Sequence, residues 1–302
     1  MGVPDGKTMK IGYFGDGPWA HEAFKKLMND KTIAVKFVTV RFDKKDPKLI
    51  SMAEKCGVPV ELSKNINSDE FLDRIGKYEA DLFVSMSFDQ IFKTKAINFP
   101  PLKTINCHAG KLPFYRGRNI LNWALINDEK EFGITVHYMD EGVDTGDIIL
   151  QRTYPITDED DYSTLLHTAY AGCADVLYSA IKQIQNGTVK QVRQDDIDPV
   201  GMYCGIRRTG DEAINWNETS RTLFNFVRAI CKPGPMATST LNGKEIKINK
   251  VKEISGARTY IGTPGQILGK TERGFFVKTK DTFIEVAEFE YEGKIRVGDR
   301  ML

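Results

Sequence analysis

Cysteine is scarce in this chain, and the few cysteines lack the regular spacing of a disulfide framework or a zinc site. The 302 residues contain five of them and no C-x-x-C pair; they are Cys56, Cys107, Cys173, Cys204 and Cys231. An odd and dispersed set argues against a disulfide framework and against a structural zinc site. The simplest interpretation is a set of reduced thiols, so we expect a cytoplasmic protein without a metal.

Long apolar runs are also missing. No stretch approaches the ~20 apolar residues that a membrane-spanning helix needs. The N-terminus, M-G-V-P-D-G-K-T-M-K, has no apolar run either, which argues against a signal peptide and suggests a short unstructured lead. We therefore expect no membrane partner.

Neither sign of charge is in surplus. The chain has 42 Lys and Arg residues against 41 Asp and Glu residues, which gives a net charge of +1. A protein that binds a polyanion usually carries a basic surplus. We therefore expect no nucleic-acid partner, although a local basic patch is compatible with these numbers.

The composition changes in texture along the chain, and its length suits two domains of about 100–200 residues each. Segments of strand character alternate with segments of helix character in the first part, which predicts an α/β domain with a parallel, doubly wound sheet. Residues 194–205 resemble a linker. From residue 233, short strands alternate with Gly turns, including the hairpin signal Asn242-Gly243, which predicts a small barrel or sandwich. The expected domains are 1–205 and 206–302.

The expected elements of the first domain are strands at 10–15, 34–41, 58–61, 81–87, 102–108, 133–139 and 147–156 and helices at 18–29, 48–56, 68–77, 120–127 and 163–186. The second domain is expected to have a helix at 218–231 and strands at 237–241, 246–251, 265–270, 274–278 and 283–291.

Three polar residues within a 39-residue stretch suggest a chemical function. Asn106 and His108 end the strand expected at 102–108, and successive side chains of a strand point to opposite faces, so these two share a face and Cys107 takes the other. Asp144 follows in M-D-E-G-V-D-T-G-D. An amide, an imidazole and a carboxylate can together orient an amine, move its proton and stabilise an oxyanion, which is the equipment for acyl transfer. Ligands of open parallel sheets bind at the carboxyl ends of strands. From the residues alone, a catalytic and a structural role for His108 stay equally open.

Other patterns are weaker. An aspartic protease needs two D-T-G carboxylates, whereas this chain has one, and Asp144 could simply be a turn residue. The segment G-Y-F-G-D-G resembles a dinucleotide-binding loop only loosely. The remaining histidines lack metal-ligand spacing and are expected to be structural; they are His21, His137 and His167.

The loop after residue 108 contains a cluster of basic and aromatic residues. Tyr115, Arg116 and Arg118 could hold a phosphate or carboxylate, because the planar Arg fork pairs with such groups through two hydrogen bonds. An ordinary solvated cluster is the alternative.

The combined motifs resemble a known family. N-x-H at 106–108, L-P-x-x-R-G-R at 112–118 and D-T-G at 144–146 are similar to the signature of the 10-formyltetrahydrofolate-dependent formyltransferases. The resemblance covers nearly the whole chain, including the change of texture near residue 210. It implies a Rossmann-like, mostly parallel N-terminal domain, a C-terminal OB-like β-barrel domain, and N10-formyltetrahydrofolate as co-substrate.

The resemblance also implies roles for individual residues. His108 would be the general base for the attacking amine, Asn106 would hydrogen-bond the formyl oxygen, and Asp144 would orient His108. The residues implied in folate binding are Ser87, Phe88, Gln90, Ile91, Phe92, Arg118, Asp140, Glu141, Gly142 and Val143. Those expected to bind the amine substrate are Lys111, Tyr115, Arg116, Arg207 and Arg208. For Arg207 and Arg208, binding a diphosphate and bracing the domain junction stay equally open.

The amine acceptor distinguishes the branches of this family. The branch that acts on glycinamide ribonucleotide usually lacks the C-terminal barrel. Members that act on methionyl-tRNA carry a basic insertion after the second strand, whereas residues 41–50 form only a short segment here, with four Lys or Arg residues and two Asp residues. Residues 204–216, C-G-I-R-R-T-G-D-E-A-I-N-W, are similar to F-G-R-R-T-x-x-D-x-x-x-x-W in the formyltransferase domain of the bacterial aminoarabinose-pathway enzyme.

These features favour a sugar N-formyltransferase of the nucleotide-sugar branch. We expect transfer of a formyl group to a nucleotide-linked amino sugar, with a UDP-linked 4-amino-4,6-dideoxy hexose favoured, as in formyltransferases of pseudaminic acid pathways. The product would enter surface polysaccharide or glycan biosynthesis. The alternatives are a methionyl-tRNA formyltransferase and a non-catalytic folate-binding module. A homodimer through the C-terminal half is compatible with the sequence.

Overall fold

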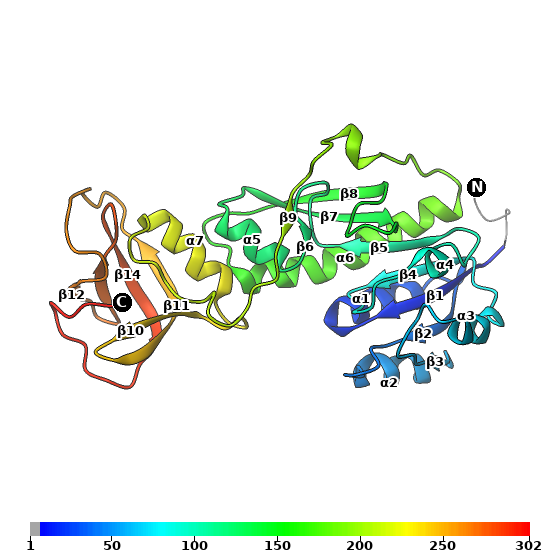
Figure 1. Cartoon of the computed structure of the whole chain (residues 1–302), viewed down its shortest axis with the longest axis horizontal. Helices are drawn as coiled ribbons and strands as arrows, with labels where there is room; N and C mark the ends of the chain where they lie inside the picture. The colour runs from blue at the N-terminus through cyan, green and yellow to red at the C-terminus, as the bar shows by residue number, and fades with distance from the viewer. Residues whose placement is uncertain (1–6) are drawn as a thin grey trace. The chain divides into compact units, whose positions relative to one another are not determined.

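The computed structural model describes residues 7–302 (Figure 1). By its internal contacts the chain forms two compact units. The first comprises residues up to 117, 132–154 and 167–204, and the second comprises 118–131, 155–166 and 205–302. The domain boundary at 205/206 stays a prediction. Of the expected N-terminal lead, residues 1–6 lie outside the described residues, and the first strand already begins at Met9.

A large sheet forms the first unit (Figure 1). Within the described residues it has seven strands, in the order β3 (Val60–Glu61), β2 (Ile33–Thr39), β1 (Met9–Gly15), β4 (Leu82–Met86), β5 (Thr104–His108), β7 (Glu131–Tyr138) and β8 (Ile148–Pro155). The pairings from β3 to β5 are parallel, whereas β7 runs antiparallel to β5. The expected mostly parallel α/β sheet is confirmed.

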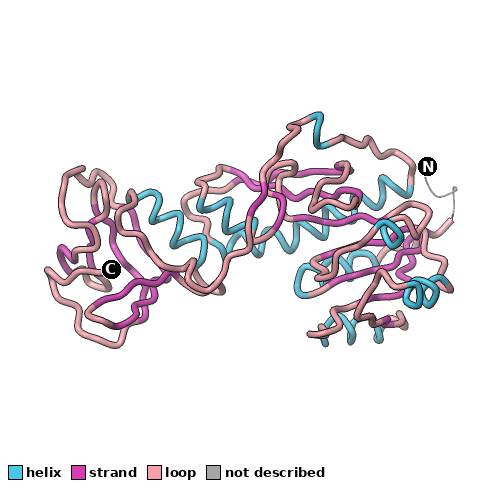
Figure 2. Tube along the Cα trace, viewed as in Figure 1, coloured by secondary structure: helices cyan, strands magenta, loops and turns pink. Residues whose placement is uncertain are grey.

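Helices cover both faces of this sheet; they are α1 (Gly17–Met28), α2 (Pro47–Lys55), α3 (Asp69–Gly76), α4 (Thr94–Ile97) and α6 (Tyr162–Gln185) (Figure 2). On one face, an aromatic cluster around Phe14 packs against α3 and α4. On the other face, the ring of Tyr13 lies 6.0 Å from that of Phe24 in α1, and Trp19 lies 4.6 Å from Tyr170 in α6. Burial on both faces explains why the residues of β4 are all buried and mostly apolar.

Local sequence signals set the helix ends. Asp46 caps α2, since its carboxylate accepts from the main-chain N–H groups of Lys48 and Leu49. Ser68 caps α3 by accepting from Phe71 N–H. A side-chain oxygen at this position satisfies an amide that the helix leaves unpaired. The expected helix at 68–77 is therefore confirmed to within a residue at each end.

The second unit contains an antiparallel sheet. Its order is β10 (Ala237–Leu241), β11 (Lys244–Glu253), β14 (Phe283–Glu290), β13 (Phe275–Lys278) and β12 (Ile267–Lys270). Asn242 and Gly243 form the turn between β10 and β11 with positive φ angles of 51° and 76°, so the expected hairpin is confirmed. The closure of this sheet into an OB-like barrel stays a prediction.

Two helices of the second unit are joined by polar contacts. Within α5 (Ile120–Ile126), Asn122 donates from Nδ2 to the carbonyl of Ala229 in α7 (Ser220–Ile230). Arg221 of α7 contacts three carboxylates, those of Asp128, Asp158 and Glu253. One guanidinium thus connects α7 with two loops and with the end of β11.

None of the helices in the described part of the chain combines the length and the apolar character that a bilayer crossing requires.

Replacing Arg221 with Gln should destabilise the second unit. The variant loses several charge-assisted hydrogen bonds, which are typically worth about 1.5–3 kcal/mol. Urea unfolding followed by tryptophan fluorescence measures the loss. The control is Glu290→Gln, which removes the exposed pair with Lys232 and should cost less than about 1 kcal/mol. Equal losses in the two variants would show that the Arg221 contacts add nothing beyond a surface pair.

Candidate active site

Asn106 and His108 lie at the carboxyl end of β5, where the sequence places them. The Sγ–H of Cys107, between them, points to the carbonyl of Cys173 in α6 at 3.7 Å. Cys107 therefore faces the α6 side of the sheet, and strand alternation puts Asn106 and His108 together on the opposite side.

The antiparallel pairing of β5 with β7 adds a residue that the sequence interpretation missed. In this register His137 lies directly opposite Asn106, and Nδ2 of Asn106 is 3.4 Å from Nε2 of His137. His137 is buried. The sequence signal was a single imidazole within the apolar strand G-I-T-V-H-Y-M, which we interpreted as structural.

Asp144 completes the site from the loop after β7. Its Oδ2 lies 3.6 Å from Nδ1 of His108, and its Oδ1 lies 3.6 Å from Nε2 of His137. Oδ2 also accepts a hydrogen bond of 2.9 Å from the main-chain N–H of Gly117, and Nδ2 of Asn106 approaches Oδ1 to 3.5 Å. The structure therefore brings together the three residues selected from the sequence.

Main-chain carbonyls determine which ring nitrogens carry protons. Nε2 of His108 donates to the carbonyl of Tyr115 at 2.7 Å, and Nδ1 of His137 donates to that of Tyr138 at 2.8 Å. A carbonyl can only accept, so these nitrogens hold the hydrogen in a neutral ring. The nitrogens that face Asp144 are then bare. Each can take up a proton, and the resulting N–H points at the carboxylate.

The electrostatics of the site keep Asp144 ionised. Burial by itself would raise the pKa of this carboxyl, but the electrostatic interaction with His108, the contacts with His137 and the Gly117 N–H outweigh burial and hold the pKa well below its ordinary value. A carboxylate that stays charged beside two imidazoles stabilises whichever ring accepts a proton.

Two glycines make room for these contacts. Gly117 has a φ of +100°, and a Cβ at this position would lie 2.4 Å from the carbonyl oxygen of Cys204. A Cβ on Gly110 would lie 2.5 Å from Nε2 of His108. Since real Cβ atoms do not approach other atoms so closely, side chains at these positions would displace the site.

The segment expected to bind folate follows β4 and has mixed surroundings. Phe88 packs against the aromatic core, and Phe92 belongs to that core. Gln90 joins two turns of the chain by donating to the carbonyl of Ser63 and accepting from Ile66 N–H. Ile91, by contrast, is 75% exposed. Ser87 has a positive φ of 58°, which fixes the bend at the end of the strand.

The second folate segment is the turn before Asp144. Asp140 accepts from Gly142 N–H and from the hydroxyl of Thr145, and Glu141 accepts from the hydroxyl of Thr94. Val143 is 54% exposed. Ile91 and Val143 are thus large apolar side chains exposed on two segments of the first unit, and such side chains are suited to contact the flat face of an aromatic ring. Their contact with folate stays a prediction, as does that of Arg118, which belongs to the second unit.

The residues expected to bind the acceptor have different surroundings. Tyr115 contributes its carbonyl to His108. Arg116 is buried, and its donors are occupied within the protein. The guanidinium of Arg207 lies over the rings of Trp123 and Phe226 at 5.6 and 5.5 Å, contacts that lie within the second unit. Both roles expected for Arg207, binding a diphosphate and bracing the domain junction, stay predictions. Arg208 and Lys111 are not part of the Asp144 cluster, and their binding of substrate stays a prediction.

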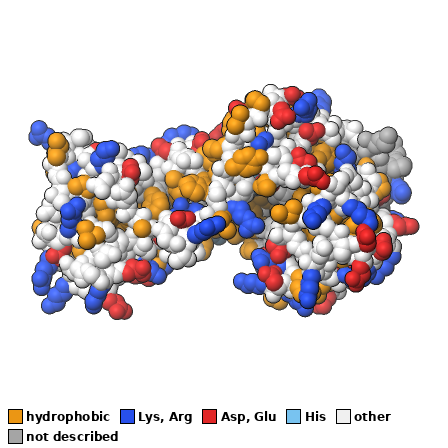
Figure 3. Space-filling view, viewed as in Figure 1, with side chains coloured by type: hydrophobic (Ala, Val, Ile, Leu, Met, Phe, Trp, Pro, Cys, Tyr) orange, Lys and Arg blue, Asp and Glu red, His pale blue; other side chains and the backbone are white. Residues whose placement is uncertain are grey.

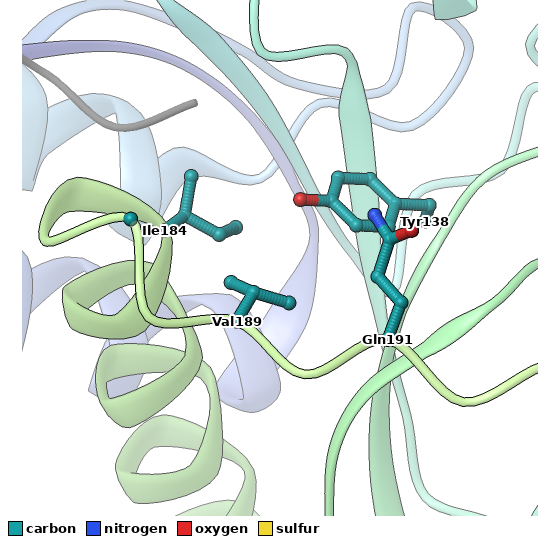
Figure 4. Close-up of a pocket in the computed structure, with 5 residues that line it drawn as sticks. Tyr138, Ile184, Val189 and Gln191 are labelled. Atoms are coloured by element: carbon teal, nitrogen blue, oxygen red, sulfur yellow. The ribbon is translucent and has the colours of Figure 1, made fainter.

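A hollow of about 320 Å³ lies elsewhere in the first unit (Figure 4). Its lining residues are Tyr138, Ile184, Gly187, Val189 and Gln191. The side chains of Tyr138 and His137 point to opposite faces of β7 because they are consecutive. The hollow is therefore separate from the Asp144 cluster. Within residues 7–302, no group of three or more potential ligands is arranged to hold a metal ion.

An amide, two imidazoles and a carboxylate at the carboxyl edge of an open α/β sheet define a site for moving a proton and transferring an acyl group. Family models agree with this class of chemistry. Residues 9–179 match the model described as formyl transferase, and residues 208–299 match the formyl transferase C-terminal domain. The chain belongs to the formyl transferase family, whose formyl donor is N10-formyltetrahydrofolate, as expected.

The names of individual relatives refer to different acceptors. The chain is 30% identical over 301 residues to a methionyl-tRNA formyltransferase of Halothermothrix orenii, which covers 96% of this chain and 94% of that protein. It is similar in structure to WlaRD, a sugar 3N-formyl transferase solved with dTDP and 5-N-formyl-THF, at 22% identity and a TM-score of 0.68, covering 95% of this chain and 100% of that one. It is also similar to an N-formyltransferase from Helicobacter canadensis in complex with folinic acid and dTDP-3-aminofucose, at 23% identity and a TM-score of 0.67, covering 94% and 100%. At these identities the likeness of the structures concerns the fold.

The low pKa of Asp144 makes stability depend on pH. Because the native pKa lies below that of the unfolded chain, the stabilisation is present above about pH 4 and is lost as the pH falls towards the native pKa. Between about pH 5 and pH 3, the free energy of unfolding of the unmodified protein should fall by about 1 kcal/mol more than that of Asp144→Asn. Urea unfolding at both pH values measures this difference. If the free energy of unfolding falls equally in the two proteins, the lowered pKa of Asp144 in the native state is contradicted.

Proposed function

We propose that the protein transfers a formyl group from N10-formyltetrahydrofolate to the amine of a nucleotide-linked amino sugar. A UDP-linked 4-amino-4,6-dideoxy hexose is the favoured acceptor, and the product would enter surface polysaccharide or glycan biosynthesis. The convergence of Asn106, His108 and Asp144 at one edge of the sheet carries the proposal, because these groups supply each part of the reaction.

The bound folate supplies the formyl carbon that the amine attacks. The acceptor must first be a free amine, since an ammonium has no lone pair. His108 takes its proton at Nδ1, the nitrogen that its hydrogen bond to Tyr115 leaves bare. Asp144 stabilises the imidazolium, and the proton then passes to the departing nitrogen of the donor. The C–N bond to the acceptor forms as the bond to the donor breaks, so no oxidant or reductant is needed.

Asn106 stabilises the formyl oxygen while that oxygen is negatively charged. The present contacts of its amide are long, 3.4 Å to His137 and 3.5 Å to Asp144. Hydrogen bonds of that length are weak, so the amide can turn to a closer acceptor at small cost. One oxyanion donor is typically worth about 3–4 kcal/mol in the transition state.

The surroundings of Arg41, in the segment after β2, support a sugar acceptor. Arg41 is paired with Asp43 and lies 3.5 Å from Asp89. A guanidinium surrounded by carboxylates is poorly placed to bind a nucleic-acid phosphate. The likeness of residues 204–216 to a sugar-modifying enzyme points the same way.

A methionyl-tRNA formyltransferase is the second candidate, and two observations favour it. Relatives that cover most of the chain carry this name. Residues 205–302 contain 17 Lys and Arg residues against 12 Asp and Glu residues, so the balanced total of +1 conceals a basic C-terminal region (Figure 3).

We also propose that the sheet of this region closes into the expected OB-like barrel, since Met301 bridges to Leu241 and Arg300 to Gln266.

Removing the proposed base should abolish turnover without preventing donor binding. For His108→Ala we expect kcat to fall by about 10²–10⁴-fold, with the Kd for a stable folate analogue close to that of the unmodified protein. Tetrahydrofolate release and isothermal titration measure the two quantities. The control is His167→Ala, which changes a solvent-exposed histidine of α6. Turnover of His108→Ala near the unmodified rate would refute the assignment.

A panel of acceptors should identify the branch. Tetrahydrofolate release is measured with UDP-, dTDP- and GDP-linked 4-amino sugars and with methionyl-tRNA, and we expect turnover with a nucleotide sugar. Binding of tRNA is titrated at several salt concentrations in parallel. Tight binding that weakens steeply with salt, together with formylation of methionyl-tRNA alone, would replace the sugar proposal with the second candidate.

A further inference from the structure

Gln194 is a buried glutamine whose side chain is fully hydrogen-bonded. It begins the short helix η1 (Gln194–Asp196) in the segment that the sequence suggested was a linker, and it is 2% exposed. Its Nε2 donates to the carbonyls of Asp144 and Gly146, both at 2.8 Å. Its Oε1 accepts from Nη2 and Nε of Arg116 at 2.8 and 3.0 Å. Four such bonds use both amide hydrogens and both lone pairs of the amide oxygen.

Arg116 is an unusual partner because its guanidinium donates to uncharged groups. Besides Gln194, its guanidinium donates to the carbonyl of Val200 and to the hydroxyl of Tyr203, and it lies 5.2 Å from the ring of Tyr203. The fork that would bind a phosphate or carboxylate is instead occupied by an amide oxygen. Its donors are therefore used to organise the protein, and the expectation that Arg116 binds substrate is disfavoured.

The two side chains form part of a closed ring of bonds around Asp144. Gly117, the next residue after Arg116, donates its main-chain N–H to the carboxylate of Asp144. Gln194 donates a hydrogen bond to the main-chain carbonyl of Asp144. Asp144 is thus held at its side chain and at its main chain by elements that Arg116 joins.

The backbone of Asp144 needs such support. Its φ is +56°, in the left-handed region, which costs an L-residue about 1–2 kcal/mol. The segment that carries Gln194 is itself fixed, since Val192 exchanges two main-chain hydrogen bonds with Ile148 and β9 (Tyr203–Cys204) pairs with β6 (Arg116–Gly117).

We infer that Gln194 and Arg116 are positioning residues that hold the carboxylate of Asp144 against His108 and His137. The inference rests on the proposed formyl transfer and deepens it. Arg116 and Gln194 fix the loop, and the loop fixes the distance from the carboxylate to both rings. Because a displacement of about 1 Å in such a group can cost up to 10²-fold in rate, loosening the loop should lower kcat with little effect on KM.

The decisive variant is Gln194→Glu. Its carboxylate still accepts from Arg116, so the contact that braces the fold remains, but it can no longer donate to Asp144 or Gly146. The matched control is Gln191→Glu, which adds the same charge three residues earlier at an exposed position. If Gln194→Glu does not fold, Gln194→Met, of similar length, is assessed by the same criteria.

Two measurements test the inference in the intact protein. In ring ¹⁵N–¹H spectra of the resting protein, which has only four histidines, we expect the signals of His108 and His137 to move and those of His21 and His167 to stay. In turnover assays we expect kcat to fall by about 10–100-fold with KM for the donor changed less than about 3-fold. The control variant should match the unmodified protein in both measurements.

The possible failures are distinguishable. Unmoved His108 and His137 signals together with an unchanged kcat in Gln194→Glu would overturn the positioning role. A raised KM with an unchanged kcat would also overturn the positioning role, because it would assign Gln194 to substrate binding. If the unmodified protein formylates no acceptor, the proposed function fails, and the spectra still decide whether Gln194 positions Asp144.

Discussion

A buried carboxylate must be compensated, and in this protein the compensation of Asp144 organises the site. Its oxygens face one main-chain N–H, one amide and two imidazoles. A charge that was taken out of water without such partners would be neutralised by a proton. With them the carboxylate stays ionised beside both rings. The acid–base capacity of the site is therefore a property of the cluster and not of His108 alone.

The cluster depends on the register of β7 against β5 and on the course of the loop that follows β7. In this antiparallel register His137 lies opposite Asn106, and the end of β7 lies beside the start of β5. The loop after β7 then folds back on the strand, since Tyr138 N–H donates to the carbonyl of Asp147. This return brings the carboxylate of Asp144 within 3.6 Å of both imidazoles.

Much of this arrangement could be predicted from local sequence. The period of two along β5 placed Asn106 and His108 on one face, the hydroxyl of Ser68 marked the start of α3, and Asn242-Gly243 marked a hairpin. Each of these features depends on residues a few positions apart. The resemblance of the motifs added the family and the co-substrate.

What could not be predicted depends on contacts between distant segments. The direction of β7 is set by its pairing with β5, so the place of His137 was hidden although its residue type was noticed. Gln194 lies in an irregular, polar segment, and nothing local distinguishes it from the exposed Gln191. The total charge did not reveal the basic C-terminal region, since a balanced sum says little about how charges are divided between the two parts of the chain.

Gly117 has a further consequence for how this chain can change over evolution. The group that it offers to Asp144 belongs to the main chain, so every amino acid except proline would provide it. Yet any side chain there would collide with the carbonyl of Cys204 and require a backbone angle that L-residues avoid. Most amino acids could therefore supply the hydrogen bond at this position, but only glycine fits the space and the backbone angle. Among natural variants we expect it to be invariant for steric reasons, whereas drift at Cys204 should be free as long as its backbone stays in place.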